Sequence, residues 1–222
     1  MFNLDLIELQ SLRQINGPKR YYELPDGKKY PSVTTILSAM SDKSFLVAWK
    51  KRVGEEEANR KLVQASARGT AVHAICEKYV LNQPVDMSGE MPLTTRCYNQ
   101  LRNFVRDNVN NIRSSEGQLY SHTLKTAGSV DLVAEYRGMP AIIDFKTSEK
   151  EKKEEWIENY FLQTSMYSFM LWERTGLLYP NIVVAIGVDE RNEAQIFARK
   201  AKDYLPKAKK MCIEYHERFE NE

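Results

Sequence analysis

The sequence has few cysteines, no long apolar run and almost no net charge, and each shortage excludes a class of protein. Its three cysteines, Cys76, Cys97 and Cys212, have neither CxxC nor zinc-ribbon spacing. Because each lies in an apolar periodic stretch, we expect buried, reduced thiols. No stretch reaches the ~20 apolar residues that a membrane-spanning helix needs, so no membrane partner is expected.

The charge balance and the first residues exclude further classes. The 32 basic and 30 acidic residues leave a formal charge of +2, so any nucleic-acid-binding surface must be local. The opening residues MFNLDLIELQ contain neither a signal peptide nor an arginine-rich transit sequence, which predicts a cytoplasmic protein. Because no Walker A motif is present, ATP is not an expected cofactor.

No repeat, low-complexity segment or Pro/Gly/Ser linker divides the chain, so we expect one domain over residues 1–222. The periodicity and turn signals predict these elements: a hairpin over 19–30, a helix over 32–40, helices over 43–82 with breaks near Gly54 and Gly69, a helix over 93–112, strands at 118–125, 129–136 and 141–147, a helix over 150–175, strands at 181–188 and 194–199, and a helix over 201–220. This order indicates an α/β or α+β domain.

The turn centred on Arg137-Gly138 determines which residues of the two flanking strands face each other. It pairs Asp131 with Asp144, with Cβ atoms about 4.5–5.5 Å apart. Strand alternation puts Lys146 on the face of Asp144, with Ser129 opposite it. The other face of the hairpin is apolar and is expected in the core: it contains Val130, Leu132, Ala134, Ile143 and Phe145.

Two carboxylates at that separation repel each other unless one is protonated or a hard divalent cation such as Mg²⁺ or Mn²⁺ binds between them. Such an ion polarises a phosphoryl oxygen and lowers the pKa of a bound water. Lys146 would orient that water or offset developing charge. The alternatives are a solvated hairpin with cross-strand ion pairs and a register shifted by one bulge.

A helix beginning at 68–70 presents His73 between Thr70 and Glu77 on one face. The neighbouring stripe is apolar, so His73 borders the core. A helical histidine alone is more often a structural hydrogen-bonding residue. Beside the hairpin, His73 becomes a third candidate metal ligand, with Glu77 as a supporting residue.

Four motifs follow one another along the chain: Gly69-Thr70-x-x-His73, Gly128-Ser129-x-Asp131, Asp144-Phe145-Lys146-Thr147 and Gln163-x-x-x-Tyr167. The series resembles that of the PD-(D/E)XK nuclease superfamily, in its RecB-like exonuclease branch. The segments 31–34 and 144–148 are similar in particular to the mitochondrial genome maintenance exonuclease family and its phage and bacterial relatives. The resemblance spans roughly residues 19–190.

The resemblance implies a central mixed β-sheet flanked by helices. It implies a restriction-endonuclease-like core over 66–200, an N-terminal DNA-binding hairpin and helical extension over 1–65, and a C-terminal helix over 201–222. The implied function is a metal-dependent exodeoxyribonuclease that hydrolyses single-stranded or end-bearing DNA in replication, recombination or repair. Mg²⁺ or Mn²⁺ is the implied cofactor, and phage or host recombination proteins are further implied partners.

The resemblance also implies roles for individual residues. The implied metal ligands are His73, Asp131, Asp144 and the main-chain carbonyl of Phe145. Lys146 would be the catalytic lysine, acting with the two aspartates. Further support of the site or of the DNA strand is implied for Gln163, Tyr167, Glu77, Glu116, Ser129 and Thr147.

The sequence departs from some members of that branch. Those with an iron–sulfur cluster hold it with four cysteines, and this chain has three at unsuitable spacing, so no cluster is expected. A mitochondrial address is also absent, which favours the cytoplasm of a bacterial or phage-infected host cell.

Aromatic and basic residues alternate in two N-terminal segments. Positive charge beside stacking rings is typical of single-stranded nucleic-acid binding. The candidate DNA-binding residues are Lys19, Arg20, Tyr21, Tyr30, Trp49, Lys50 and Arg52. The alternative is that these rings pack inward and the charges are solvated. Two other functions stay open, a structure-specific endonuclease with the same site and a non-hydrolytic DNA-binding or recombination partner.

Overall fold

Five strands form the central sheet of the computed structural model, which describes residues 1–219. In sheet order they are β4 (Val109–Ser121), β5 (Thr126–Tyr136), β6 (Met139–Ser148), β7 (Asn181–Val188) and β8 (Gln195–Lys200). β6 and β7 are parallel and the other neighbours are antiparallel. The predicted α/β class with a central mixed sheet flanked by helices is therefore confirmed.

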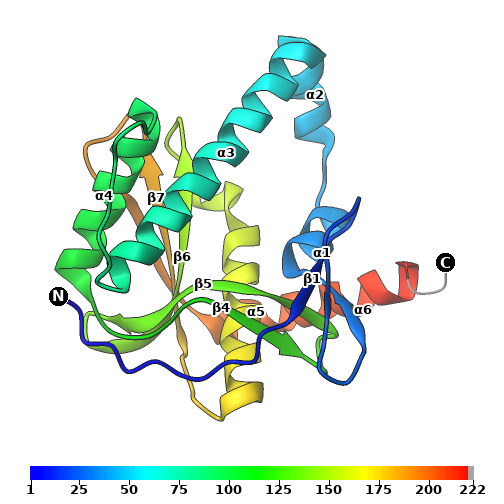
Figure 1. Ribbon diagram of the computed structural model, residues 1–222. Helices are drawn as coiled ribbons and strands as arrows, with labels where there is room; N and C mark the ends of the chain where they lie inside the picture. The colour runs from blue at the N-terminus through cyan, green and yellow to red at the C-terminus, as the bar shows by residue number, and fades with distance from the viewer. Residues whose placement is uncertain (220–222) are drawn as a thin grey trace.

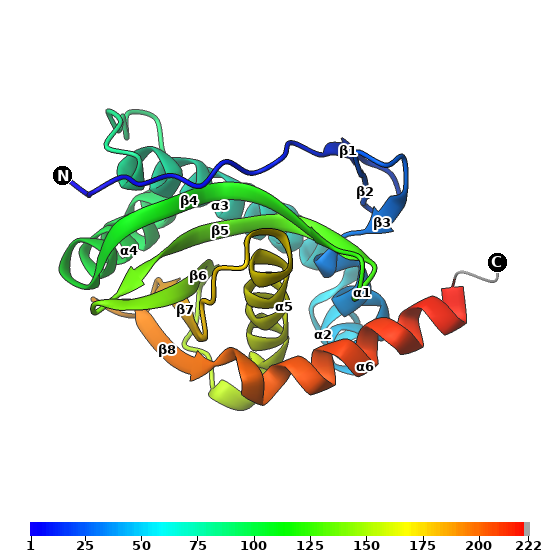
Figure 2. The same cartoon turned by 90° about the horizontal axis from the view of Figure 1, so that it is seen from below.

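Helices cover both faces of this sheet (Figures 1 and 2). α5 (Glu158–Thr175) packs on one face, with α6 (Ala201–Phe219) and α1 (Val33–Met40) around it. α3 (Glu55–Val80) and α4 (Pro92–Asn108) pack on the other. Two apolar clusters result. One contains Val133 and Ile142 beneath α5, and the other contains Leu132, Ile143 and Phe145 beneath α3 and α4.

This burial on both faces corrects the predicted hairpin. We expected only the apolar face in the core, but the face with Asp131 and Asp144 also packs, beneath α5, and Val133 and Ile142 on it are fully buried. Strands that are covered on both faces have nearly continuous apolar sequences, and β6 and β7 are examples. Val130, predicted beside Leu132, lies instead in the α5 cluster.

The N-terminal part forms a separate small sheet of β1 (Arg13–Ile15), β2 (Tyr21–Glu23) and β3 (Lys29–Pro31). The predicted hairpin is β2 and β3, and β1 is an additional strand that the sequence patterns did not indicate. Before it, the chain runs beside β4 (Figure 2), where the Asp5 and Ile7 amides donate to Ile112 and Arg113 carbonyls at 3.0 and 2.7 Å.

α2 (Ser44–Val53) and the first half of α3 project from the body (Figure 1), and no residue of α2 is buried. The predicted break at Gly54 is confirmed, because Gly54 has a φ of 88° between the two helices. The predicted break near Gly69 is wrong, since α3 continues through it. A single glycine costs a helix only about 1 kcal/mol, which the packing of its second half exceeds.

Two other predicted helices are too long. The helix predicted over 93–112 ends at Asn108, and the β-branched Val109 and Ile112 continue as strand because β5 offers them a pairing partner. The helix predicted from 150 begins at Glu158, after a short 3₁₀ turn, η1 (Glu154–Trp156). The charged residues before it favour helix locally but offer no apolar stripe to pack.

The strand predicted at 118–125 is the end of β4, and residues 122–125 form the turn before β5. The other predicted elements are present. The Ser32 side chain caps α1 by accepting from the Thr35 amide, and Gly176 ends α5 with a φ of 74°. The C-terminal helix is confirmed to Phe219, and residues 220–222 lie outside the described residues. All three cysteines are buried and unpaired. In the described part of the chain, every helix is too short or too polar to cross a membrane.

Candidate active site

The β5–β6 hairpin has the predicted register. Leu132 pairs with Ile143, and the two turn residues Arg137 and Gly138 have φ values of 51° and 76°, as a tight hairpin turn of type I′ requires. The ladder ends at the Leu132–Ile143 pair, whereas β6 continues beside β7 to Ser148. The two strands therefore separate where the paired aspartates were predicted.

Asp131 bridges this separation with its side chain. The Phe145 amide donates to Asp131 Oδ2 at 2.7 Å, replacing a ladder hydrogen bond. Asp131 is 7% exposed and Asp144 1% exposed. The alternative of a solvated hairpin is therefore wrong, and both carboxyl groups are in a low-dielectric environment.

α3 brings His73 onto the same point. Its Nε2 lies 2.8 Å from the Phe145 carbonyl oxygen, and its Nδ1 lies 3.6 Å from Asp131 Oδ1 and 3.5 Å from Glu116 Oε1. The ligand atoms of His73, Glu116 and Asp131 all lie within 4.8 Å of one another, so these three side chains could hold a metal ion. The predicted meeting of His73, Asp131 and the Phe145 carbonyl is observed.

Glu116 is closer to this centre than the sequence indicated. It lies within β4 rather than ahead of it, with a φ of 51° at an irregular part of the strand. Ser129 fixes it, because the Ser129 hydroxyl donates to the Glu116 carbonyl at 2.9 Å and to Oε2 at 3.1 Å. The irregular backbone that aims Glu116 at His73 has no simple sequence signal, since positive φ is uncommon outside glycine.

Asp144 is outside the three-residue group and faces Lys146. Lys146 Nζ pairs with Asp144 Oδ2, and within the described residues the buried Oδ1 has no hydrogen-bond partner. Lys146 Nζ also lies 5.2 Å from the centre of the Tyr160 ring, a favourable cation–π position. Tyr160 was not among the predicted site residues. Its spacing from Gln163 and Tyr167 on one helix face was the available signal.

Gln163 and Tyr167 border the aspartates from α5. They are 8% and 3% exposed. Tyr167 packs against the backbone of Gly128, so closely that a Cβ on Gly128 would lie 2.8 Å from the tyrosine oxygen. Burial raises the pKa of Tyr167 well above its usual value, and the nearby Asp131 and Asp144 raise it further. The tyrosine is therefore neutral beside the carboxylates.

The centre holds its protons unusually tightly. Burial raises the pKa of Asp131 to about 7, although His73 opposes the shift. Burial lowers the pKa of His73, but Asp131 and Glu116 outweigh it and raise this pKa to about 9. Burial likewise opposes the charge of Lys146, yet Asp144 and Asp131 raise its pKa. Because these raised pKa values keep protons on Asp131 and His73, binding of a metal cation between the two groups should release those protons.

The other predicted supporting residues lie around this centre. Burial, followed by Glu116, raises the pKa of Glu77, one turn along α3 from His73. The Thr147 hydroxyl accepts from Arg68 Nε at 3.3 Å.

The predicted DNA-binding residues differ in exposure. Lys19, Arg20 and Arg52 are exposed, whereas Tyr21, Trp49 and Lys50 are half-buried. Tyr30 is only 8% exposed and its hydroxyl contacts His122 Nδ1 at 3.0 Å. The prediction of Tyr30 as a stacking surface is wrong, because its ring packs inward as the alternative proposed. Phe45, which is 78% exposed on α2, presents the open aromatic surface instead.

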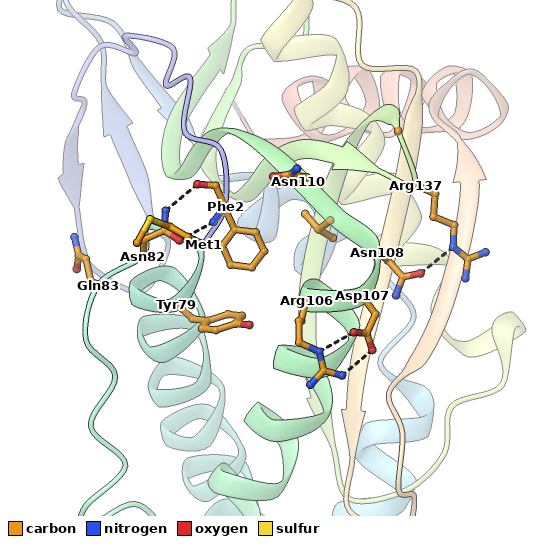
Figure 3. A pocket seen from close by; sticks show the side chains of 12 residues that line it. Met1, Phe2, Tyr79, Asn82, Gln83, Arg106, Asp107, Asn108, Asn110 and Arg137 are labelled. Carbon is orange, nitrogen blue, oxygen red and sulfur yellow. Dashed lines mark hydrogen bonds and ion pairs between the residues drawn. The ribbon is translucent and has the colours of Figure 1, made fainter.

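A cavity of about 610 Å³ lies at the other end of the hairpin (Figure 3). It is bounded by the first residues of the chain, the ends of α3 and α4, and Arg137-Gly138. In this cavity Arg106 donates a hydrogen bond to Asp107, and Arg137 donates one to Asn108 (Figure 3). None of the predicted site residues lines this cavity.

No family model matches the sequence. Over 129 residues the chain is 30% identical to mitochondrial genome maintenance exonuclease 1 of Homo sapiens, covering 55% of this chain and 38% of the human protein. The chain is related to this exonuclease. The Mus musculus and Xenopus tropicalis proteins of the same name are also 30% identical over 129 residues.

The chain spans well under two thirds of the length of these curated relatives, 38% for the human and mouse proteins and 37% for that of Xenopus tropicalis. A crystal structure of a Eubacterium rectale protein, proposed to be an exonuclease, superposes with a TM-score of 0.48 and 14% identity. That superposition covers 68% of this chain and 65% of the other.

Proposed function

We propose that this chain is a metal-dependent exodeoxyribonuclease of the PD-(D/E)XK type that hydrolyses phosphodiester bonds of single-stranded or end-bearing DNA. The observation that supports it best is the convergence of His73, Glu116 and Asp131 ligand atoms within 4.8 Å. The Asp144–Lys146 ion pair lies beside them. The 30% identity to mitochondrial genome maintenance exonuclease 1 supports hydrolysis of DNA as the reaction.

The donor set suits a hard divalent cation. Asp131 and Glu116 supply carboxylate oxygens, and His73 supplies a nitrogen. The Phe145 carbonyl, which the resemblance implies as a further ligand, contacts His73 Nε2, whereas Nδ1 faces the two carboxylates. Asp144 lies beside this group with Oδ2 paired to Lys146, and its buried Oδ1 has no hydrogen-bond partner among the described residues. A buried, unpartnered carboxylate oxygen is costly, so Oδ1 is a further candidate metal ligand. Mg²⁺ or Mn²⁺ fits these ligands, and Mn²⁺ tolerates the imidazole better. When bound, the ion would polarise a phosphoryl oxygen and acidify a water.

The chain's own residues provide the rest of the site. Lys146, kept protonated by Asp144 and held over the Tyr160 ring, stabilises negative charge that develops on the phosphate. Tyr167 and Gln163 form the buried wall on the α5 side and keep bulk water from the aspartates. Ser129 holds Glu116 in its unusual backbone position.

We assign the DNA strand to the surface that leads from this centre onto the N-terminal extension. Arg20, Arg52 and Lys19 are exposed there, and Phe45 offers a ring for stacking. Charge with open aromatic surface suits single strands of any sequence. With this substrate we propose a role in replication, recombination or repair, with recombination proteins as partners in a bacterial or phage-infected cytoplasm.

The decisive experiment uses purified chain with Mg²⁺ or Mn²⁺ on single- and double-stranded DNA, blocked at the 5′ or 3′ end. Lys146→Ala is the test variant and Lys202→Ala, on the exposed side of α6, is the matched control. We expect Lys146→Ala to bind DNA normally and to cleave about 10²–10³-fold more slowly, the usual effect of removing one charge-stabilising group. Equal cleavage by Lys146→Ala and wild type would remove Lys146 from the mechanism.

Two outcomes would replace the proposal by its alternatives. Cleavage of covalently closed circular single-stranded DNA indicates an endonuclease, because a strict exonuclease needs an end. Binding without any cleavage in either metal indicates a DNA-binding or recombination-partner module.

A further inference from the structure

Arg68 is a nearly buried cation at the edge of the candidate active site. Its side chain is only 9% exposed. It lies on α3 ahead of His73, and its Nε donates to the Thr147 hydroxyl at 3.3 Å. Thr147 directly follows Lys146 on β6. The guanidinium therefore lies between the helix that supplies His73 and the strand that supplies Lys146.

The charge of Arg68 is poorly matched by the protein itself. Among the described residues its carboxylate partner is Glu149, with Nη1 and Oε1 3.9 Å apart. That distance is too long for a hydrogen bond. The Glu149 side chain is 52% exposed, and ion pairs with such exposed groups are weak and easily exchanged. Most donors of this guanidinium fork are thus available to a stronger anion.

We propose that Arg68 binds a backbone phosphate of the DNA strand next to the phosphate that is cut. The inference rests on the proposed function and deepens it. A planar guanidinium matches two phosphate oxygens at once, which a lysine cannot do. No ion pair joins Arg68 to Asp131, Asp144 or Glu116 in the described chain. Arg68 therefore serves a neighbouring phosphate rather than the reacting one.

A purely structural role, tying α3 to β6 through Thr147, is the competing explanation. Arg68→Gln separates the two, because glutamine keeps an N–H donor for Thr147 but removes the charge. Arg68→Lys keeps the charge and loses the fork. Arg106→Gln is the matched control, since Arg106 is 57% exposed at the far end of α4 and binds Asp107.

The experiment measures binding of single-stranded oligonucleotides by fluorescence anisotropy without divalent metal, so that no cleavage occurs. Each oligonucleotide carries one neutral methylphosphonate, placed at each linkage in turn. We expect wild type to lose about tenfold or more in affinity at one linkage, the usual effect of losing a charged hydrogen bond. Arg68→Gln should bind unmodified DNA correspondingly more weakly and show no further loss at that linkage. Arg106→Gln should keep the wild-type profile.

The deciding quantity is whether the affinity loss caused by the Arg68 substitution and the loss caused by the methylphosphonate at one linkage are non-additive in free energy. Arg68→Lys should retain the loss at the same linkage in weaker form, which keeps the test usable where Arg68→Gln does not fold. The proposal is overturned in favour of the structural role if, in both Arg68→Gln and Arg68→Lys, the affinity loss from the substitution and the loss from the methylphosphonate are independent at every linkage. A chain that binds DNA with this profile but never cleaves it refutes the nuclease proposal alone.

Discussion

The two halves of α3 have opposite environments. The second half packs on the sheet with Val72, Ile75 and Cys76 buried, and it places His73 beside Glu116 and Asp131 in the candidate metal-binding group. The first half projects beyond the body with Leu62 and Val63 exposed by 41% and 68%. One continuous helix therefore serves two purposes. Packing gives the fixed position that metal ligands need, and exposure leaves surface for a substrate to contact.

The largest effect should follow from removing the ligand in the packed half. His73→Ala is expected to lower cleavage about 10²-fold or more, because a metal ligand contributes more than the 10–100-fold typical of residues that only support one. Leu62→Ala, on the same helix, should change cleavage of a short oligonucleotide little. Mn²⁺ titration calorimetry on both variants is the direct check, and unchanged Mn²⁺ affinity in His73→Ala would exclude it as a ligand.

Substitution of two valines on α3, one in each half, tests how much each half contributes to the free energy of unfolding. Val72 is 0% exposed and Val63 is 68% exposed. We expect Val72→Ala to lower the free energy of unfolding by about 2 kcal/mol, since it removes two buried methyl groups. Val63→Ala should stay within about 0.5 kcal/mol of wild type. Urea unfolding measures both. Equal losses would mean that the first half packs against something in solution.

The proton-binding groups predict a pH-dependent response to metal. The pKa of Asp131 is raised from 3.8 to about 7 and that of His73 from 6.5 to about 9. Raised pKa values stabilise the metal-free fold at low pH. The Asp131 contribution is lost as pH rises from about 4 through 7, and the His73 contribution from about 6.5 through 9. Mg²⁺ should therefore raise Tm more at pH 9 than at pH 6. A larger shift at pH 6 would contradict the assignment.

The smallest effect is expected on α2. Arg52 is exposed there, so Arg52→Gln should weaken single-stranded DNA binding a few-fold regardless of sequence. It should also reduce the slope of log affinity against log salt by about 0.7. Tm should not change. A salt slope identical to wild type would place the DNA elsewhere than on this projecting part.

The positions of the main site residues could be predicted from the sequence because turn conformation, strand alternation and helix periodicity depend on local sequence. The turn at Arg137-Gly138 needs two positive φ values, and that requirement set the hairpin register as far as the Leu132–Ile143 pair, next to Asp131 and Asp144. The strand pattern also gave β5 to β8 nearly to their ends. Helix periodicity was enough to place His73 at the edge of the core, even though the helix begins much earlier than expected.

What the sequence could not predict depends on tertiary contacts. Glu116 has a positive φ where it approaches His73, and β4 shifts its register shortly before, between Asn110 and Ser114. Tyr160 meets Lys146 because α5 crosses the sheet at this point. Arg68 looked like an ordinary helix-start residue until the unbroken helix placed it against Thr147.

Phe145 shows why side-chain mutagenesis would overlook part of this centre. Its amide is held by Asp131 and its carbonyl by His73, whereas its ring is merely one more buried apolar group. Exchange of that ring for leucine would report on core packing and say nothing about the centre. Proline, which has no N–H to donate, is the substitution that would reach the main-chain contact. The contribution of Phe145 to the candidate site therefore lies in its main-chain N–H and C=O groups, and of these only the N–H can be removed by a substitution, to proline.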